Sequence, residues 1–284
     1  MSAMKSINII GGGRVGKTLG RAWHSSASYR VQDVLTRSLA SAQQAVAFIG
    51  AGHATAALAD LRSADVWMLA VPDSQIAPTA AALAQAVATR PSSDRPQPGN
   101  PPPIAFHCSG ALSADELAPL RALGWQVASA HCLLSFANPG LALQQLAGTP
   151  CALEGDPAAV SALQPAFEHL GARCFGLAAE HKLLYHAGAV FATNFLPVLQ
   201  DLAQQLWLDS GMPAGMAAQL HSTLLRNAVD NLLALGPVGA LTGPAARGDL
   251  ALVQRQGEAV AQWNATAGEA YRSLSQLAAK LAAS

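Results

Sequence analysis

Short apolar runs alternate with alanine- and leucine-rich stretches over the first 177 residues of the chain. This alternation predicts βαβ units and a doubly wound, mostly parallel sheet. The runs that we predict to be strands are Ile7–Ile10, Val31–Thr36, Val66–Val71, Ile104–Phe106, Gln126–Ala130, Cys151–Leu153 and Arg173–Phe175. Between two of these units, Thr89–Pro103 holds six prolines and little apolar content, which predicts a surface loop.

Helical periodicity dominates after Leu177, so we predict an α/β domain over residues 1–177 and an all-α domain over residues 178–284. Within Glu180–Leu208, Pro197 should offset the helix locally. The predicted continuation is a helix from Pro213 to Leu235, a turn-rich connection from Leu235 to Gly248, a helix capped by Asp249, and a last helix over Gly268–Ala283.

The strongest local motif is Gly11-Gly12-Gly13-Arg14-Val15-Gly16, a GxGxxG between the strand Ile7–Ile10 and a predicted helix over Val15–Ser25. Gly11 permits the tight turn, Gly13 lets the main chain approach a diphosphate, and Gly16 packs the helix against the strand. The free N–H groups of the first helical turn, including those of Arg14 and Val15, then receive the phosphates. This context predicts a Rossmann-like dinucleotide site; the alternative is a glycine-rich turn without a ligand.

The end of the second predicted strand reads Leu35-Thr36-Arg37-Ser38. An NAD site normally places an acid here for the ribose 2′-OH, whereas the only nearby acid, Asp33, lies inside the strand. Thr36, Arg37 and Ser38 instead offer a guanidinium and two hydroxyls, which suit a 2′-phosphate. We therefore expect NADP(H), with a solvated loop arginine as the alternative.

The turn Val71-Pro72-Asp73 follows the third of these long strands. Ligands of open α/β sheets bind beyond the carboxyl ends of the strands, so this turn should flank the nicotinamide half of the cofactor. An ordinary strand–helix turn is the alternative interpretation.

Polar residues also follow the next two strands. Ser109-Gly110 can supply a hydroxyl and main-chain donors to a substrate oxygen, and His107 or His131 can position substrate or move a proton near neutral pH. Each histidine can equally do no more than bind a loop carbonyl.

The helix that opens the second domain carries Lys182, Tyr185 and His186. Lys182 and His186 share one face, and burial beside an apolar nicotinamide would lower the lysine pKa toward a working acid–base range. A solvated lysine at a helix start is the competing interpretation. Further along, Leu241–Asp249 holds Arg247 and Asp249 in a turn-rich loop that either reaches an active site, even that of a second subunit, or only joins two helices.

Composition narrows the classes of partner. The formal net charge is zero, which gives no general attraction to nucleic acid or to a membrane surface. The widely spaced Cys108, Cys132, Cys151 and Cys174 form no CxxC pair, so we expect neither a metal site nor a disulfide framework. No apolar run reaches the length of a membrane span, and no leader pattern is visible at the start. We expect a reduced, cytoplasmic protein.

These motifs resemble a superfamily of two-domain enzymes that includes pyrroline-5-carboxylate reductase, 6-phosphogluconate dehydrogenase and the β-hydroxyacid dehydrogenases. Strings over residues 107–117, 182–186 and 241–249 (HCSGALSADEL, KLLYH and LTGPAARGD) look more closely like a family of predicted NADP oxidoreductases whose second domain is a domain of unknown function, DUF2520. The resemblance covers nearly the whole chain. In the sugar-acid and hydroxyacid relatives a lysine is followed four residues later by asparagine; Lys182 matches that lysine, and His186 takes the asparagine place.

The resemblance implies a helical domain of the 6-phosphogluconate dehydrogenase C-terminal type, often used for dimerisation, and hydride transfer with NADP(H). We therefore expect an oxidoreductase acting on a C=O or C=N group of a small, anionic substrate. Ser109 and His131 would orient the substrate, and Lys182, assisted by His186, would give or take the proton. The alternatives are a sensor or interaction module that binds NADP(H) without turnover, and a deazaflavin in place of the nicotinamide. The apolar helices around Phe191–Trp207 lead us to expect a homodimer.

Overall fold

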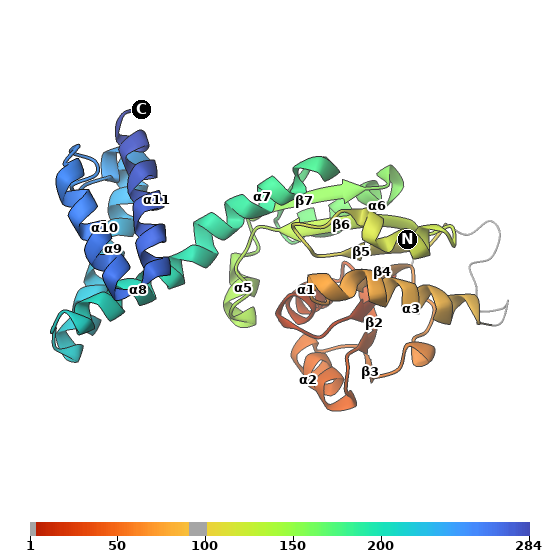
Figure 1. Ribbon diagram of the computed structural model, residues 1–284. Helices are drawn as coiled ribbons and strands as arrows, with labels where there is room; N and C mark the ends of the chain where they lie inside the picture. The colour runs from red at the N-terminus through yellow and green to blue at the C-terminus, as the bar shows by residue number, and fades with distance from the viewer. Residues whose placement is uncertain (1–3, 91–100) are drawn as a thin grey trace. The chain divides into compact units, whose positions relative to one another are not determined.

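The computed structural model describes residues 4–90 and 101–284 (Figure 1). The chain forms two compact units, Met1–Thr193 and Asn194–Ser284, called here the first and the second unit. The functional division expected from the sequence, cofactor binding in residues 1–177 and substrate binding or dimerisation in residues 178–284, stays a prediction. Most of the expected loop Thr89–Pro103 lies outside the described residues.

The first unit is built on one eight-stranded sheet with the order β3-β2-β1-β4-β5-β6-β7-β8. All neighbouring strands are parallel except β6 and β7, which pair antiparallel. The strands are β1 (Ser6–Ile10), β2 (Arg30–Leu35), β3 (His53–Thr55), β4 (Val66–Leu69), β5 (Ile104–His107), β6 (Gln126–Cys132), β7 (Pro150–Gly155) and β8 (Arg173–Gly176). The predicted mostly parallel, Rossmann-like sheet is confirmed. Strand β3 was not predicted, because its three residues at the sheet edge are too few to show an alternating pattern.

Helices cover both faces of this sheet. One apolar core packs α1, α2, α5 and α6 against one face, and a second core packs α3, η4 and α4 against the other. The α-helices are α1 (Arg14–Ser25), α2 (Leu39–Ile49), α3 (Ile76–Ala88), α4 (Ala118–Arg121), α5 (Pro139–Gln145), α6 (Pro157–Glu168) and α7 (Lys182–Ala189). Short 3-10 turns are η1 (Leu58–Asp60), η2 (Asp73–Gln75), η4 (Ala114–Leu117) and η5 (Ala179–His181).

Aromatic side chains fill the two cores. Trp23 of α1 makes edge contacts with the rings of Tyr29, Phe106 and Phe167, and its indole N–H donates to the Ala166 carbonyl at 3.2 Å. A buried indole is well accommodated only when its N–H finds such an acceptor. This packing holds the strands rigidly, so their carboxyl ends form a fixed edge on which a site can be built.

The second unit is helical, with α8 (Phe195–Asp209), α9 (Ala214–Ala240), α10 (Leu250–Trp263) and α11 (Ala265–Ala282). The predicted offset near Pro197 is confirmed, because η6 (Val190–Asn194), a π-helical turn, stands between α7 and α8. The predicted cap Asp249 is confirmed as well; its carboxylate accepts from the Leu252 N–H at 3.2 Å.

Two helix boundaries differ from the prediction. Helical structure resumes after Leu235, at Pro237, and continues to Ala240, interrupted by Gly236 at φ +70°. The predicted turn-rich connection therefore shrinks to the segment after Ala240, because proline is well suited to the first turn of a resumed helix. The last helix starts at Ala265, where the Asn264 side chain caps it by accepting from Ala267 N–H at 3.0 Å. None of the helices in the described residues combines the length and apolarity of a membrane span.

Candidate functional site

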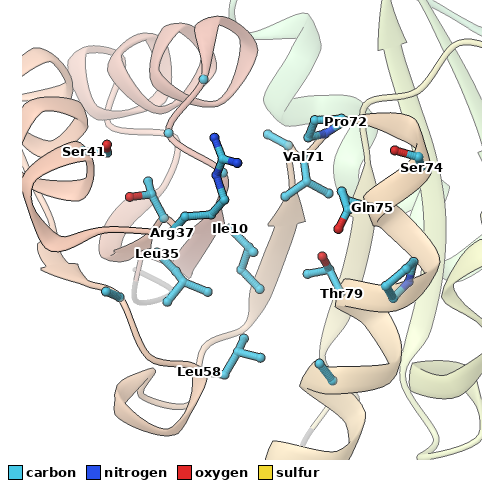
Figure 2. A pocket seen from close by; sticks show the side chains of 18 residues that line it. Ile10, Leu35, Arg37, Ser41, Leu58, Val71, Pro72, Ser74, Gln75 and Thr79 are labelled. Carbon is cyan, nitrogen blue, oxygen red and sulfur yellow. The ribbon is translucent and has the colours of Figure 1, made fainter.

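A pocket of about 960 Å³ opens at the carboxyl ends of β1, β2 and β4. It is lined by Gly11 and Gly13 from the turn after β1, by Thr36 and Arg37 after β2, and by Val71 and Pro72 after β4. In Figure 2 the Arg37 side chain points into the space between Ser41 on one side and Val71 and Pro72 on the other. The structure thus brings together the three strand ends that the sequence predicted to hold a dinucleotide.

Two glycines of the motif are required by close approach of the main chain. Gly11 has φ +109°, and a Cβ there would lie 2.3 Å from the Ala70 carbonyl oxygen. A Cβ on Gly16 would lie 2.0 Å from the Gly11 carbonyl oxygen. Both positions therefore exclude any side chain, and they bring α1 directly against the end of β1.

The third glycine leaves open space. A Cβ on Gly13 would meet nothing within 4 Å, and Gly13 caps α1 without any side-chain hydrogen bond to the helix. The first-turn N–H groups, those of Arg14, Val15 and Gly16, have no acceptor one turn back along the helix. An uncapped helix start that faces a pocket fits a diphosphate, because the N–H groups and the helix dipole both favour an anion.

The end of β2 supplies the cation of the pocket. Arg37 is exposed and lines the pocket together with Ser41 of α2, a residue that the sequence analysis did not single out. No acidic residue is among the described residues that line the pocket. Asp33, the acid of β2, is fully buried and holds the Arg62 guanidinium at 2.5 Å. Asp33 is therefore paired with Arg62 inside the first unit, and it does not line the pocket as an acceptor for a ribose would.

The hydroxyls beside Arg37 have local partners. Thr36 Oγ1 donates to the Ser38 carbonyl at 2.8 Å, and Ser38 caps α2 by accepting from the Ser41 N–H at 3.2 Å. These bonds shape the turn that carries Arg37. Serine is a common helix cap, so Ser38 could have been recognised in the sequence as the start of α2. Ser41 would then have been placed in the first turn of that helix, close to Arg37.

Asp73, which follows the pocket residue Pro72, is hydrogen-bonded to Ser109 in the loop after β5. Ser109 Oγ donates to Asp73 Oδ2 at 2.9 Å and accepts from the N–H groups of Ala111 at 3.2 Å and Leu112 at 3.1 Å. The Ser109 hydroxyl is therefore engaged in shaping its own loop. Asp73 thus contacts the loop after β5 and is not among the described residues that line the pocket.

Lys182 is almost fully buried, with 1% of its surface exposed. Its Nζ donates to Ser129 Oγ at 2.5 Å and to the Ser109 carbonyl at 3.3 Å. Burial lowers the pKa of Lys182, while the carboxylates of Glu154 and Asp73 oppose that shift. The expected alternative of a solvated lysine is wrong, since α7 inserts this side chain against the ends of β5 and β6.

His131 and His186 lie together beside Gly110. Their ring centroids are 5.6 Å apart, and a Cβ on Gly110 would lie 2.7 Å from His186 Nδ1 and 2.8 Å from His131 Nε2. His131 Nδ1 shares a hydrogen bond of 3.1 Å with the Tyr185 hydroxyl. Burial, with the nearby His186 and Lys182, lowers the pKa of His131 to about 4, so its imidazole is neutral near pH 7. His186 Nδ1 is buried and has no hydrogen-bond partner in the described part of the chain.

His107 is fully buried, and both of its ring nitrogens bond main-chain atoms of the loop after β5. Its Nε2 lies 2.9 Å from the Ser113 carbonyl, and its Nδ1 accepts from the Ser109 N–H at 3.2 Å. Because a carbonyl requires a donor, Nε2 carries the proton and the ring is neutral. Burial lowers the pKa of His107 to about 4. Of these two histidines, His131 contacts the His186 ring, whereas His107 is bonded to the loop that follows its own strand.

Ser129 and Glu154 are two further residues that the sequence did not point to. They face each other in the antiparallel β6–β7 pair, and Glu154 accepts from the Ala114 N–H at 2.8 Å. Burial raises the pKa of Glu154. Neither residue carries a local signal, since each sits inside a strand and meets Lys182 only through tertiary packing. The described residues contain no group of three or more His, Cys, Asp or Glu that could hold a metal ion.

Two family models match the chain: a Rossmann-like domain over residues 1–131 and a domain of unknown function (DUF2520) over residues 149–278. The chain combines a Rossmann-like domain with a DUF2520 domain. This confirms the resemblance seen in the motifs. No curated protein matches the chain.

Three solved structures share the fold. A Thermotoga maritima protein, TM1727, is 24% identical with a TM-score of 0.70, over 97% of this chain and 98% of that one. A proposed NADP oxidoreductase from Bacteroides fragilis, BF3122, is 19% identical with a TM-score of 0.73, over 98% of each chain. A pyrroline-5-carboxylate reductase from Streptococcus pyogenes is 14% identical with a TM-score of 0.59, over 98% of this chain and 99% of that one. At these identities the similarity shows the fold of the chain.

Proposed function

We propose that this protein is an NADP(H)-dependent oxidoreductase. The observation that carries the proposal is the pocket at the ends of β1, β2 and β4, which offers an open helix start to a diphosphate and a guanidinium to a further phosphate. Arg37 lines this pocket, and none of the described lining residues is acidic. A 2′-phosphate suits that charge, whereas a bare ribose would leave it unpaired.

In this proposal Gly11, Gly13 and the N–H groups of Arg14, Val15 and Gly16 hold the diphosphate. Thr36, Arg37 and Ser38 form the turn for the 2′-phosphate. Val71 and Pro72 line the pocket on the nicotinamide side, and Asp73 follows them at the start of η2. The cofactor supplies the hydride chemistry when bound. The protein contributes position, orientation and a site from which water is excluded.

The proposed substrate is a small anionic molecule with a C=O or C=N group. Lys182 is the proton donor or acceptor that accompanies hydride transfer, because burial draws its pKa down while its ammonium remains hydrogen-bonded. His131, neutral near pH 7, orients the substrate, and His186 assists from the adjacent turn of α7. Since the Ser109 hydroxyl is occupied by Asp73 and by its own loop, Ser109 acts on the substrate through the main chain around Gly110.

Calorimetric titration of the full-length protein with NADPH, NADH and a reduced deazaflavin tests the cofactor choice. NADPH should bind most tightly, and Arg37→Ala should weaken NADPH about 10- to 100-fold while leaving NADH unchanged, because one charge-assisted contact is lost. Arg173→Ala, which alters an exposed arginine of β8, is the matched control. Equal binding of both nicotinamide dinucleotides, or binding of the deazaflavin alone, would overturn the choice of NADP(H).

Turnover separates an enzyme from a sensor that only binds NADP(H). A panel of keto acids, imines and aldehydes should contain a compound that drives NADPH consumption, and Lys182→Met should reduce kcat about 100-fold or more with little change in NADPH affinity. Lys280→Met, at the end of α11, is the control. Tight NADPH binding with an inert panel would favour the sensor, although the burial of Lys182 argues against it.

We also propose a homodimer formed through the second unit. Its helices expose many large apolar side chains, among them Met216, Leu233, Leu235 and Leu250, each with more than half of its surface accessible. Exposed large apolar side chains in this number support an interface with a second copy of the chain.

A further inference from the structure

The Lys182 amine, carried by α7, is bonded to groups from two other elements. Ser129 Oγ comes from inside β6, the Ser109 carbonyl comes from the loop after β5, and Lys182 itself opens α7. Ser129 is fully buried, and its own hydroxyl proton goes to the Ser109 carbonyl at 3.2 Å. The two acceptors of the amine are therefore tied to each other and cannot move independently.

The number of hydrogen-bond donors on Lys182 matters for the bonds that it makes with Ser129 and Ser109. An ammonium has three donors, and two of them are taken by Ser129 Oγ and the Ser109 carbonyl. A neutral amine has two donors and one lone pair, so it can satisfy the same two acceptors and keep its lone pair for a proton. Loss of a proton from Lys182 thus strands neither acceptor, which is the condition for a reversible proton carrier in a buried place.

We propose that Ser129 is a positioning residue of this site, which holds Lys182 Nζ in place and leaves its third valence for the proton that is gained or lost. The inference rests on the proposed function only where it connects Ser129 with proton transfer by Lys182. The arrangement of Ser129, Ser109 and Lys182 can be tested on the protein without substrate or cofactor.

Other charged groups face the same amine. The carboxylates of Asp73, at the start of η2, and Glu154, on β7, favour the ammonium. His107 on β5 and His131 on β6 are both neutral near pH 7, since each has its pKa lowered to about 4. Ser129 Oγ is the closest partner of Nζ, at 2.5 Å, and it accepts a hydrogen bond. Its removal should therefore destabilise the ammonium relative to the amine.

The chain has only four lysines, Lys5, Lys17, Lys182 and Lys280, which makes a direct measurement practical. Protein labelled with ¹³C and ¹⁵N in lysine alone gives four side-chain signals, and the Cε and Nζ shifts of Lys182 report its titration. Ser129→Ala should lower the Lys182 pKa by about one further unit, the size expected for one lost hydrogen bond to a charged group. Ser129→Thr, which keeps the hydroxyl, should restore the wild-type titration. The signals of Lys5, Lys17 and Lys280 are internal controls.

The wild-type protein provides a second measurement that does not depend on how Ser129→Ala folds. A hydrogen-bonded, buried ammonium exchanges its protons slowly, so the ¹⁵Nζ signal of Lys182 should persist at temperatures where those of the other lysines are lost. An unchanged Lys182 titration in folded Ser129→Ala, or fast exchange at Lys182 in the wild type, would overturn the proposal. Failure of NADPH binding or of turnover would instead overturn the proposed function and leave this arrangement standing.

Discussion

The two compact units differ in what they bury. The first unit encloses large side chains, including Trp23, Trp67, Phe106 and Phe167, together with the charged Lys182. In the second unit, all of whose residues the structure describes, the buried residues are Ala217, Gly257, Ala267 and Gly268. These four carry a methyl group or no side chain at all.

This difference separates two sources of stability. Burial of a large apolar side chain contributes about 1.5–3 kcal/mol, so the first unit can stabilise itself through its own core. The second unit gains little free energy in this way. Its small residues instead let the helices approach closely, since a Cβ on Gly268 would lie only 2.5 Å from Ala261 of α10. Its large apolar side chains remain available to a partner. The first unit is therefore expected to respond to changes in its interior, and the second to changes on its surface.

The largest expected effect is in the interior of the first unit. Gly16→Ala places a methyl group 2.0 Å from the Gly11 carbonyl oxygen, where the main chain must move to accept it. We expect a loss of about 3 kcal/mol in the free energy of unfolding, measured by urea denaturation, together with loss of NADPH binding. Gly188→Ala is the control, because a Cβ there meets nothing within 4 Å and alanine favours a helix. Similar free energies for the two variants would show that α1 does not pack as closely as the structure indicates.

The next effect concerns the surface of the second unit. Leu233 of α9 is 81% exposed, and Leu233→Lys should weaken the proposed homodimer about 100-fold, because a twofold interface loses two buried leucines. Sedimentation velocity over a range of protein concentrations gives the dissociation constant. Gln219→Lys, on the same helix, is the control for added charge. A wild-type protein that stays monomeric at every concentration would refute the dimer and leave the apolar surface of the second unit unexplained.

The smallest of these effects is the pH dependence that buried histidines give the first unit. His107 has a folded pKa of about 4 against an ordinary value of 6.5, so the unfolded chain binds more protons between these two values. Stability should therefore fall as the pH drops through this window, and His107 alone should cost about 2 kcal/mol at pH 5 relative to pH 7.5.

Denaturation of the wild type and of His107→Gln at pH 7.5 and pH 5 measures this contribution. The variant should lose that part of the pH dependence even if it is less stable at both values. An identical pH dependence in the two proteins would mean that His107 is not held neutral by its burial. Since His131 shares the direction of this pKa shift, His131→Gln should behave similarly.

Local motifs determined much of the proposed cofactor pocket from the sequence alone. A glycine turn between a strand and a helix acts through main-chain geometry within about ten residues, so Gly11, Gly13 and Gly16 could be assigned without knowing the fold. Arg37 followed from its place at the end of a strand, because parallel strands end at a common edge. Seven of the strands were visible as apolar runs for the same local reason, whereas β3 was too short.

Only the tertiary structure decided how the lysine site is assembled. Helical spacing pointed to Lys182 and His186. It could not show that the Lys182 amine donates to Ser129 Oγ and to the Ser109 carbonyl, which are 53 and 73 residues away in the chain. Nor could it show that Asp73 contacts Ser109, or that Asp33 is taken by Arg62. Hydrogen bonds of this kind depend on which strands are neighbours and on which face each residue lies, and those relations arise only when the sheet has formed and α7 has packed against it.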